Sequence, residues 1–440
     1  MSSRTDGSYV VTQEIAASVL SIVERENISL KSALGQVTNG FDYKIRGSIH
    51  AYVFETMKRL NAIDFFLEKS LKNKNLHEID SFTRNLLRIA VYEMKFKGVH
   101  PALATDSAVR IAKKRGRNIK LVNAVLRKAE TVSLEFSNFE KIKMLSLKYF
   151  HPEWFVKYCI DLLGKKDAFK LMEANIRLQP IYIRVNELRS SINSVVRYLE
   201  SNNVEIEETF LPEVFEVISY QKHPAVLDWH RWGKYVIQDL ASCYVSHVLD
   251  PQPDERIVDL AAATGIKTSH IAMLMQNSGK IFAIDNSRKR LMRMKNKLKT
   301  LGVSNVELIL GDGCSISLNA DKALVDAPCS STGSYWMHPN VKWTFDKKKF
   351  KKTLKIQQKM LRNALSLTNE VVYSTCSIMF EENELNLIKV LCKVLKLKSP
   401  FSYGIRKFRG YHFKFWNRVI RSYPHLHNTS GFFIAKLAML

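Results

Sequence analysis

The sequence predicts a multidomain protein in which an all-α bundle, a small α+β domain and a doubly wound α/β domain follow one another. Three observations carry this prediction. The chain has 440 residues, enough for two or three domains of about 150 residues each. Its first third shows the apolar spacing of helices, and its last half alternates strand-like and helical segments. We place the three domains at residues 1–135, 140–225 and 226–440.

The composition is that of a basic globular protein. Hydrophobic residues make up 46% of the chain, so its domains can bury real cores. Lys and Arg number 67 against 42 Asp and Glu, and the net charge of +25 favours a polyanionic partner such as RNA, DNA or an anionic membrane. No apolar run approaches the roughly 18 to 20 residues that span a bilayer, and the N-terminal residues lack the apolar core of a signal peptide. We therefore expect a cytoplasmic protein with no membrane segment.

The six cysteines favour free thiols over disulfides or a metal site. They are irregularly spaced and include no Cys-x-x-Cys pair, so neither a disulfide scaffold nor a zinc site is expected. A cysteine is most often a small apolar filler of a core. A chemical role for any of the six therefore has to be argued from its local sequence.

The first domain is expected to be helical almost throughout. Apolar residues between positions 82 and 94 follow one helix face: Phe82, Leu86, Ile89, Ala90 and Met94. Asp80 or Ser81 is the expected N-cap of this helix, and Gly98 is its expected end. A dense basic run with no acidic residue follows: Arg110, Lys113, Lys114, Arg115, Arg117, Lys120, Arg127 and Lys128. A solvated helix face and contact with nucleic acid explain this run about equally well.

The second domain mixes helix and strand. Residues 181–186 and 214–218 have the residue types of strands, and residues 192–199 have those of a helix. These patterns indicate a small connecting domain, and they do not by themselves indicate what it does.

The third domain alternates strands with helices. Strands are expected at residues 256–260, 280–284, 306–310, 322–325 and 371–374. Such alternation is typical of a mostly parallel sheet, whose ligands bind beyond the carboxyl ends of the strands. We therefore expect the chemistry of the protein at these strand ends.

The first of these strand ends is suited to a nucleoside ligand. Residues 259–270 contain a run of small residues and open a helix, so a ligand can approach the backbone and its N–H groups. A nicotinamide enzyme would show Gly-x-Gly-x-x-Gly here, and this turn has one glycine. Asp285, Asp312 and Asp326 then follow or end the next three strands. Each could merely cap a helix, but together they favour a nucleoside cofactor that carries no phosphates.

Two cysteines also lie just beyond strand ends. Cys329 follows the strand that precedes Asp326, and Cys376 follows the strand at residues 371–374. Neighbouring strands of one sheet could bring both thiols to one pocket. A helix N-terminus and nearby cations would increase the thiolate fraction there. The placement therefore indicates reactive thiols rather than core fillers.

These motifs resemble those of the Sun (Fmu, NOL1/NOP2/Sun) family of RNA cytosine-C5 methyltransferases. The resemblance rests on the turn at 259–268, on Asp285 with Arg290, and on the segments Asp326–Ser330 and Ser374–Ser377. Residues 183–186, 238–242, 338–343 and 431–435 resemble the family's flanking segments. Residues 83–93 and 122–128 resemble a NusB-type RNA-binding domain, so the resemblance covers nearly the whole chain.

The resemblance implies a fold, a reaction and a cofactor. The fold is a NusB-like bundle, an α+β connecting domain and a Rossmann-like class I methyltransferase domain. The reaction is transfer of a methyl group from S-adenosyl-L-methionine to C5 of a cytosine in RNA, with 16S rRNA of the small subunit as the implied substrate. We expect a monomer that binds RNA and no metal. The implied cofactor-binding residues are Ala261, Ala262, Ala263, Thr264, Gly265, Ile266, Lys267, Asp285, Arg290, Asp312 and Asp326.

The resemblance also implies a catalytic set made of Cys376, Cys329, Asp326 and Lys267. C5 of cytosine is a poor nucleophile until a group adds to C6. Cys376 is implied to make that addition, and Asp326 to stabilise the charge that develops at N3. Cys329 is implied to assist release, by helping to remove the C5 proton or to expel Cys376. The target base must be flipped out of a duplex, and basic segments at residues 339–362 and 396–421 can offset that cost.

Two segments depart from the family's pattern. The typical cofactor turn is Cys-Ala-Ala-Pro-Gly-Gly-Lys, where this chain has Ala261, Thr264 in place of proline and Ile266 in place of the second glycine; Ser331 replaces another glycine. A β-branched residue is strained at positive φ, so we expect weakened cofactor binding. Alternatives are therefore a tRNA methyltransferase and a catalytically impaired RNA-binding or ribosome-assembly protein. A DNA cytosine methyltransferase is disfavoured, because its nucleophile is the Pro-Cys cysteine and it has no Thr-Cys motif.

Overall fold

A computed structural model describes residues 2–72, 75–178 and 180–440. Met1, Asn73, Lys74 and Gln179, which the expected first and second domains include, lie outside the described residues. The chain divides into two compact units: one holds the residues up to 177 together with 335–344, and the other holds 178–334 and 345–440. Within the described ranges no helix has the length and apolar character that crossing a bilayer requires.

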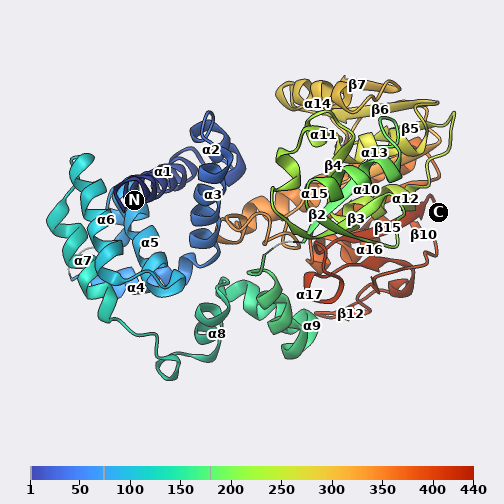
Figure 1. Cartoon of the computed structure of the whole chain (residues 1–440). Coiled ribbons are helices and arrows are strands. Elements are labelled where there is room, and N and C mark those ends of the chain that lie inside the picture. The colour runs from blue at the N-terminus through green and yellow to red at the C-terminus, as the bar shows by residue number, and fades with distance from the viewer. Residues whose placement is uncertain (1, 73–74, 179) are drawn as a thin grey trace. The chain divides into compact units, whose positions relative to one another are not determined.

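The first unit is helical, as the apolar spacing predicts (Figure 1). Seven helices surround a core that includes Leu20, Val53, Leu87 and Leu126 within the described residues, and two further helices follow. Their bounds are α1 Ser2–Glu26, α2 Leu30–Val37, α3 Tyr43–Lys58, α4 Leu60–Ser70, α5 Ser81–Tyr92, α6 Pro101–Lys114, α7 Ile119–Thr131, α8 Lys141–Tyr149 and α9 Glu153–Ala174. Short helical turns lie at η1 Leu76–Glu78, η2 Glu93–Lys97 and η3 Phe136–Asn138.

Helix α5 begins and ends as its sequence predicts. Asp80 is its N-cap and accepts a hydrogen bond from the amide of Thr83 at 3.0 Å. The turn η2 continues α5 and ends at Gly98, whose φ of 74° is in the left-handed region that glycine adopts most easily. The apolar stripe between residues 82 and 94 faces the core.

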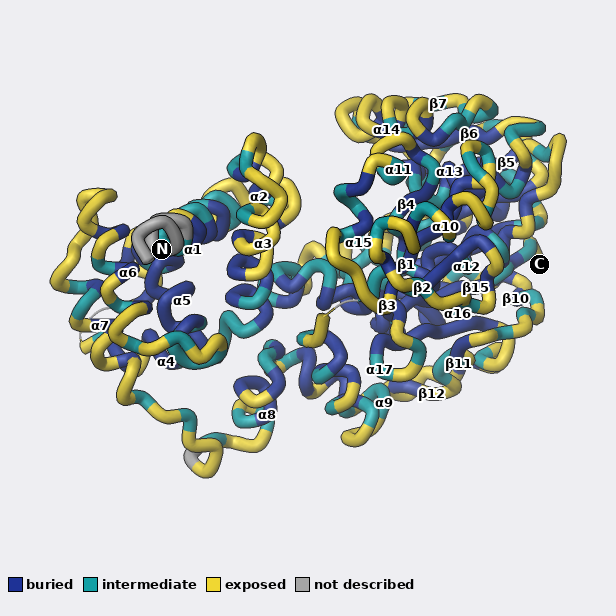
Figure 2. Tube along the Cα trace, viewed as in Figure 1, coloured by how far each residue is buried: buried dark blue, intermediate teal, exposed yellow. Residues whose placement is uncertain are grey.

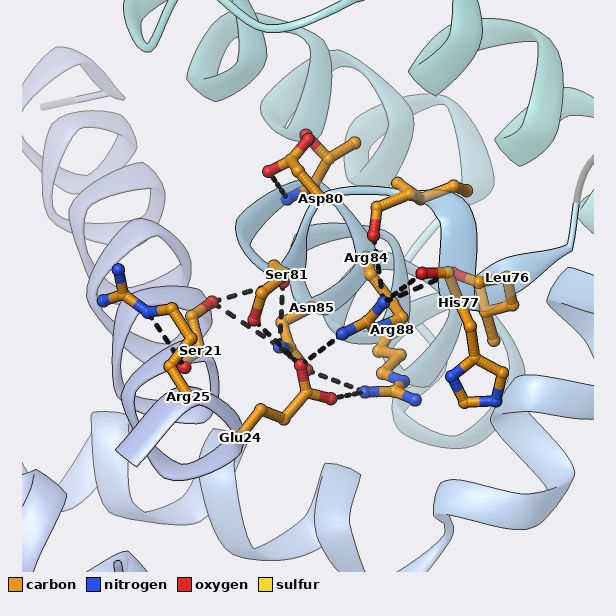
Figure 3. Close-up of polar contacts among 12 residues, drawn as sticks. Ser21, Glu24, Arg25, Leu76, His77, Asp80, Ser81, Arg84, Asn85 and Arg88 are labelled. Carbon is orange, nitrogen blue, oxygen red and sulfur yellow. Dashed lines mark hydrogen bonds and ion pairs between the residues drawn. The ribbon is translucent and has the colours of Figure 1, made fainter. Parts of the chain in front are cut away.

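A polar network connects α1 to α5 (Figure 3). The Glu24 carboxylate accepts hydrogen bonds from Ser81 and Arg84 at 2.8 Å, from Asn85 at 3.0 Å and from Arg88. Burial alone would raise the pKa of Glu24, but the two arginines outweigh burial and lower the pKa. The network therefore fixes α5 against α1 with a charged carboxylate.

Residues 335–344, which the sequence analysis places in the third domain, group with the helical unit. They contain the turn η5 Val341–Trp343. The indole N–H of Trp343 donates to the carbonyl of Met57 at 2.7 Å, and the ammonium group of Lys342 donates to the carbonyls of Lys58 at 2.8 Å and Phe150 at 2.6 Å. The segment is thus held by buried polar contacts, which leave no periodic signal in the sequence.

The second unit contains a small antiparallel sheet with strand order β2-β3-β1-β4. The strands are β1 Ile181–Val185, β2 Val204–Glu208, β3 Val214–Tyr220 and β4 Tyr235–Ile237, with helix α10 at Ile192–Ser201. The turn η4 Pro224–Val226 and helix α11 Asp228–Arg231 precede β4. The predicted strands at 181–186 and 214–218 and the helix at 192–199 are confirmed. Strands β2 and β4 were not predicted. β2 is largely exposed and β4 has three residues, so neither shows a clear alternation of apolar and polar residues.

The larger sheet has the order β11-β14-β15-β9-β8-β5-β6-β7. Five strands run parallel, as predicted: β5 Arg256–Asp259, β6 Lys280–Asp285, β7 Val306–Leu310, β8 Lys322–Asp326 and β9 Val371–Thr375. The expectation of a mostly parallel sheet needs a correction at one side, where β15 Phe433–Ala438 pairs antiparallel with β9. The remaining short strands are β10 Lys393–Val394, β11 Ser402–Tyr403, β12 Lys407–Phe408, β13 Tyr411–His412 and β14 Ile420–Arg421.

Helices cover both faces of this sheet, so its central strands are buried (Figure 2). One face packs against residues such as Met360 and Leu361, and the other against residues such as Val245 and Ile271. The helices are α12 Leu240–Leu249, α13 Ile266–Leu274, α14 Arg288–Thr300, α15 Lys347–Leu367, α16 Glu384–Val390 and α17 Pro424–His427. The turns η6 Phe380–Glu382 and η7 Trp416–Arg418 complete the unit.

Candidate active site

The carboxyl ends of the five parallel strands lie along one edge of the sheet, and the segments that follow them enclose a cavity of about 580 Å³. The predicted residues that line it are Ala261, Ala263, Asp285, Arg290, Asp312, Asp326, Cys329 and Cys376. The predicted residues that do not line it are Ala262, Thr264, Gly265, Ile266 and Lys267. A larger hollow of about 1020 Å³ along α14 and β7 contains no predicted site residue, so the candidate chemistry belongs to the smaller cavity.

At one end of the cavity Asp285 presents a nearly buried carboxylate. It accepts a hydrogen bond from the amide of Ser287 at 2.8 Å and pairs with Arg290 at 3.0 Å. Asp312 accepts a hydrogen bond from the amide of Cys314 at 2.9 Å. Both side chains are therefore fixed by their own loops while they face the cavity, which suits recognition of a ribose and a base.

The altered turn folds without strain at Ile266. This residue begins α13 and is not among the described residues with positive φ. Gly265 takes the left-handed position instead, with a φ of 84°, and a Cβ atom there would lie 2.7 Å from Met294 Cγ. Ile266 therefore does not occupy the position that needs a positive φ, because the glycine beside it takes that conformation.

The two predicted cysteines meet inside the cavity. Their Sγ atoms are 3.3 Å apart, and Cys376 Sγ is 3.5 Å from Ser331 Oγ. The hydrogen bond from Cys329 lowers the pKa of the Cys376 thiol, and the contact with Ser331 acts in the same direction. The same contact and burial raise the pKa of Cys329. The pair is therefore polarised, in that Cys376 loses its proton more readily than Cys329 does.

Beside the thiols, Asp326 accepts two hydrogen bonds. Lys267 Nζ donates to one carboxylate oxygen and Ser374 Oγ donates to the other, both at 2.8 Å. Burial alone would lower the pKa of Lys267, but the Asp326 carboxylate outweighs burial and raises it. A charged lysine is thus held next to the thiol pair although it does not itself line the cavity.

Family models match most of this chain. Residues 246–438 match the model described as 16S rRNA methyltransferase RsmB/F. Residues 11–131 match the NusB family, and residues 151–219 match the ferredoxin-like domain of RsmF/B-like methyltransferases. The chain belongs to the RsmB/F methyltransferase family. Membership confirms the predicted fold class and the predicted enzyme class, an RNA cytosine-C5 methyltransferase.

Three relatives of this RsmB/F family chain illustrate the match. Ribosomal RNA small subunit methyltransferase B of Proteus mirabilis (strain HI4320) is 27% identical over 84% of this chain and 89% of its own length. The tRNA (cytosine(72)-C(5))-methyltransferase of Pyrococcus horikoshii is 37% identical over 52% of this chain and 55% of its own length. The crystal structure of PH0851 superposes with a TM-score of 0.84 at 27% identity and covers 97% of this chain and 98% of its own.

Several residues at the cavity were not assigned a role from the sequence. Ile356 and Met360 of α15 line it, and Ser331 touches the Cys376 thiol. Ser374 belongs to the segment Ser374–Ser377 that resembles the family, but no role was predicted for it, although its hydroxyl donates a hydrogen bond to Asp326. The signal for Ser374 is a polar residue in the otherwise apolar strand predicted at 371–374, two positions before the strand-end cysteine. Ile356 and Met360 lack such a signal, because their side chains resemble any apolar helix face.

Among the described residues, Glu213, His247 and His270 form a cluster of side chains of the types that bind metal ions. Nε2 of His247 and Nε2 of His270 lie 2.7 and 3.0 Å from the same oxygen of Glu213, and the three ligand atoms lie within 4.8 Å of one another. Burial lowers the pKa of His270 to about 3, so its ring is neutral and can donate one hydrogen bond to Glu213. The hydrogen bonds account for these contacts, and the cluster shares no residue with the cavity.

Proposed function

We propose that this chain methylates C5 of a cytosine in small-subunit (16S) rRNA, with S-adenosyl-L-methionine as the methyl donor and a covalent adduct to Cys376. The observation that carries the proposal is the polarised pair of Cys376 and Cys329, 3.3 Å apart in a cavity that also presents Asp326. A single cysteine would be enough to contact a ligand or to fill space in the core. Two thiols of opposite protonation preference suit a reaction that forms and then breaks a bond to sulfur.

The cavity fits S-adenosyl-L-methionine. Its volume of about 580 Å³ falls in the usual range of cofactor sites. Asp285 is placed to accept hydrogen bonds from the ribose hydroxyls, and Asp312 to accept one from the adenine amino group. Gly313 lines the cavity wall, and a Cβ atom there would lie 2.3 Å from the carbonyl oxygen of Leu260. These two backbone segments of the wall can therefore pack closely only because residue 313 has no side chain. When bound, the cofactor supplies an electrophilic methyl group.

Cys376 begins the reaction. Its thiolate adds to C6 of the cytosine, which forms an S–C6 bond and shifts the C5–C6 electron pair so that C5 becomes nucleophilic. Lys267 and Asp326, linked by a hydrogen bond, provide and place a proton at N3, where negative charge develops. C5 would then be the atom that accepts the methyl group which the cofactor supplies when Asp285 and Asp312 hold it.

Cys329 completes the reaction. The C5 proton leaves to solvent, and its electron pair re-forms the C5–C6 double bond. The S–C6 bond breaks with its electron pair returning to Cys376, and N3 returns its proton to the Lys267–Asp326 pair. Of the two roles implied for Cys329, its raised pKa supports expulsion of Cys376, because a protonated thiol can donate a hydrogen bond to the departing sulfur. The same 3.3 Å contact thus serves both attack and release.

Small-subunit rRNA is favoured as the substrate by the helical unit. The NusB match covers residues 11–131, and the small-subunit rRNA methyltransferase B of Proteus mirabilis aligns over 84% of the chain. Helix α15 also exposes a row of lysines near the cavity-lining residues Ile356 and Met360, which suits a phosphate backbone. The lysines are Lys347, Lys348, Lys349, Lys351, Lys352, Lys355 and Lys359.

The test is methylation with radiolabelled S-adenosyl-L-methionine on unmodified 16S rRNA and tRNA transcripts. Label recovered as 5-methylcytosine in rRNA, lost with Cys376→Ala, is the expected result. Cys329→Ala should retain attack and accumulate a covalent protein–RNA adduct. Absence of label with either RNA, or an undiminished signal from Cys376→Ala, would refute the proposal.

A tRNA substrate is the second candidate. It is favoured by the 37% identity to the Pyrococcus horikoshii tRNA enzyme, although that match covers 52% of this chain. Label in tRNA but not in rRNA would establish it. The impaired RNA-binding scaffold loses one of its supports, since Ile266 does not have a positive φ, and keeps another, since Ser331 does.

A further inference from the structure

Glu382 lies directly behind the loop that carries Cys329. It ends the turn η6, and its side chain is fully buried. Its carboxylate accepts a hydrogen bond from the amide of Ser330 at 2.8 Å and another from the Ser330 hydroxyl at 2.5 Å. Burial raises the pKa of Glu382, and the hydrogen bonds from Ser330 oppose that change. The residue that follows Cys329 is therefore attached to η6 through both its backbone and its side chain.

Gln357 of α15 holds the other side of the same cysteine. Its fully buried amide nitrogen donates to the carbonyl of Pro328 at 2.8 Å and to Glu382 at 3.1 Å. Asn386 donates to the Gln357 carbonyl oxygen at 2.7 Å, which fixes the orientation of the amide. The residues before and after Cys329 are thus bound by one pair of side chains, which we call the Glu382–Gln357 clamp.

The clamp acts on one thiol more than on the other. Cys376 follows β9 directly, and that strand is paired on both sides, with β8 and β15. Cys329 instead lies in the irregular segment after β8, whose next backbone contact with the Cys376 loop is Gly333 N–H to the Cys376 carbonyl at 3.0 Å. Glu382 also accepts a hydrogen bond from Ser377, the residue after Cys376, but β9 holds that segment independently of the clamp. Loosening the clamp should therefore displace Cys329 more than Cys376.

We infer that Glu382 is a positioning residue which, together with Gln357, places Cys329 for expulsion of Cys376 from the methylated base. The inference rests on the proposed function, since it assumes the roles given to the two thiols. Attack needs a reactive Cys376, whereas release needs Cys329 at its present distance. Loss of the clamp should therefore stall the reaction after methyl transfer, with the RNA still bound to Cys376.

The experiment compares Glu382→Gln with Cys329→Ala and with Glu381→Gln, a matched control at the adjacent carboxylate. Glutamine keeps the volume of Glu382 but has one acceptor oxygen where glutamate has two. Its NH₂ group must therefore replace either the oxygen that accepts from the Ser330 hydroxyl or the oxygen that accepts from the Ser330 amide and from Gln357. Denaturing gels with labelled RNA measure the adduct, and turnover assays measure kcat and KM. We expect adduct to accumulate in Glu382→Gln as in Cys329→Ala, with kcat reduced on the order of 100-fold. KM for RNA should fall together with kcat, because the steps up to methyl transfer are unchanged and the slowed step follows them.

The adduct should disappear when Cys376→Ala is added to Glu382→Gln, and Glu381→Gln should behave as the unaltered protein. Loss of activity in Glu382→Gln without adduct, while Cys329→Ala does accumulate it, would overturn the inference and leave the proposed function intact. No adduct in Cys329→Ala would instead count against the proposed function itself. If Glu382→Gln does not fold, Gln357→Leu removes the clamp from the α15 side and decides the question by the same readout.

Discussion

The ammonium group of Lys267 lies 2.8 Å from a carboxylate oxygen of Asp326, and it is also 5.2 Å from the centre of the Phe432 ring. Lys267 is on α13 and Asp326 ends β8, so the pair joins the cofactor side of the cavity to the thiol side. The two charges act in opposite directions on Cys376: Asp326 raises the pKa of the thiol, and Lys267 lowers it. Lys267 thus opposes the effect of the Asp326 carboxylate on the pKa of the Cys376 thiol.

Replacing Lys267 by methionine should therefore slow the chemistry before release. The Asp326 charge would no longer be opposed, so the pKa of Cys376 should rise and its alkylation by iodoacetamide at neutral pH should slow. Methyl transfer should fall on the order of 100-fold, the usual cost of losing one charge-stabilising group in a site. Mass spectrometry of the Cys376 peptide and single-turnover assays measure the two effects. Lys280→Met, at the exposed start of β6, is the control, and unchanged alkylation in Lys267→Met would contradict the argument.

We expect Ser331 to lower the stability of the fold and to raise the reactivity of the Cys376 thiol. Its φ of 54° is in the left-handed region, which costs a residue with a side chain about 1 kcal/mol. Its hydroxyl lies 3.5 Å from Cys376 Sγ and helps lower the pKa of that thiol. Ser331→Gly should therefore be more stable by up to about 1 kcal/mol, less the added entropy of the unfolded chain, and should need higher pH for alkylation of Cys376. Thermal melts and the pH dependence of alkylation test both parts.

Ser331→Ala separates the two effects. Alanine removes the hydroxyl but keeps the Cβ atom, so the shift in the alkylation profile should remain and the gain in stability should not appear. Equal melting temperatures for the glycine and alanine variants would show that the left-handed backbone carries no cost.

Much of the candidate site could be predicted because it depends on local patterns. Acids and cysteines directly after strand-like runs were enough to place Asp285, Asp326, Cys329 and Cys376 on one edge, since parallel strands end together. The limits of the prediction follow from the same logic. The relation of Ile266 to Gly265 depends on which of two adjacent residues takes the positive φ, and composition does not decide that.

What could not be predicted depends on long-range packing. Glu382 reaches Ser330 across 52 positions of sequence, and Gln357 reaches Pro328 across 29, with no periodic signal for either. The antiparallel side of the large sheet was likewise missed. Pairing with β9, not its own residues, sets the direction of the six-residue strand β15, and β11 and β14 have only two residues each. Local propensity cannot identify strands that short.

Asp259 should make the protein less stable as pH rises. Burial raises its pKa from 3.8 to about 7, and one of its oxygens is buried without a hydrogen-bond partner. A raised folded-state pKa means that the folded form holds a proton the unfolded form has lost, so this contribution is present below about pH 4 and is lost by about pH 7. Urea unfolding at pH 5 and pH 8 should therefore show a larger fall in stability for the unaltered protein than for Asp259→Asn.

The full effect of such a pKa change is about 4 kcal/mol, but asparagine would place an unpaired NH₂ group where the unpartnered oxygen lies. We therefore expect Asp259→Asn to gain only roughly 1 to 3 kcal/mol at pH 8. The hydrogen bond from Thr268, 2.8 Å long, can be kept by the asparagine carbonyl. A pH dependence as steep in the variant as in the unaltered protein would assign the slope to other groups.

Glu384 and Arg421 form a buried ion pair that supports the antiparallel side of the sheet. Both side chains are at most 1% exposed, and Arg421 donates to the two carboxylate oxygens at 2.7 and 2.5 Å. Glu384→Gln would leave the guanidinium buried without its negatively charged partner and with one of the two acceptor oxygens replaced by an NH₂ group, so we expect a loss of about 3 to 5 kcal/mol in urea unfolding. The slope of the unfolding curve should stay the same, since the folded surface does not change.

Adding Arg421→Met to Glu384→Gln should restore part of this loss, because the unpaired charge is then gone. The pair connects α16 to β14, which pairs with β15, and β15 in turn pairs with the strand that precedes Cys376. Glu384→Gln should therefore lower the melting temperature well before it alters alkylation of Cys376 in the folded protein at low temperature. A loss below about 1 kcal/mol would show that the pair is compensated by its other contacts, the Ile405 amide and the Ile378 carbonyl.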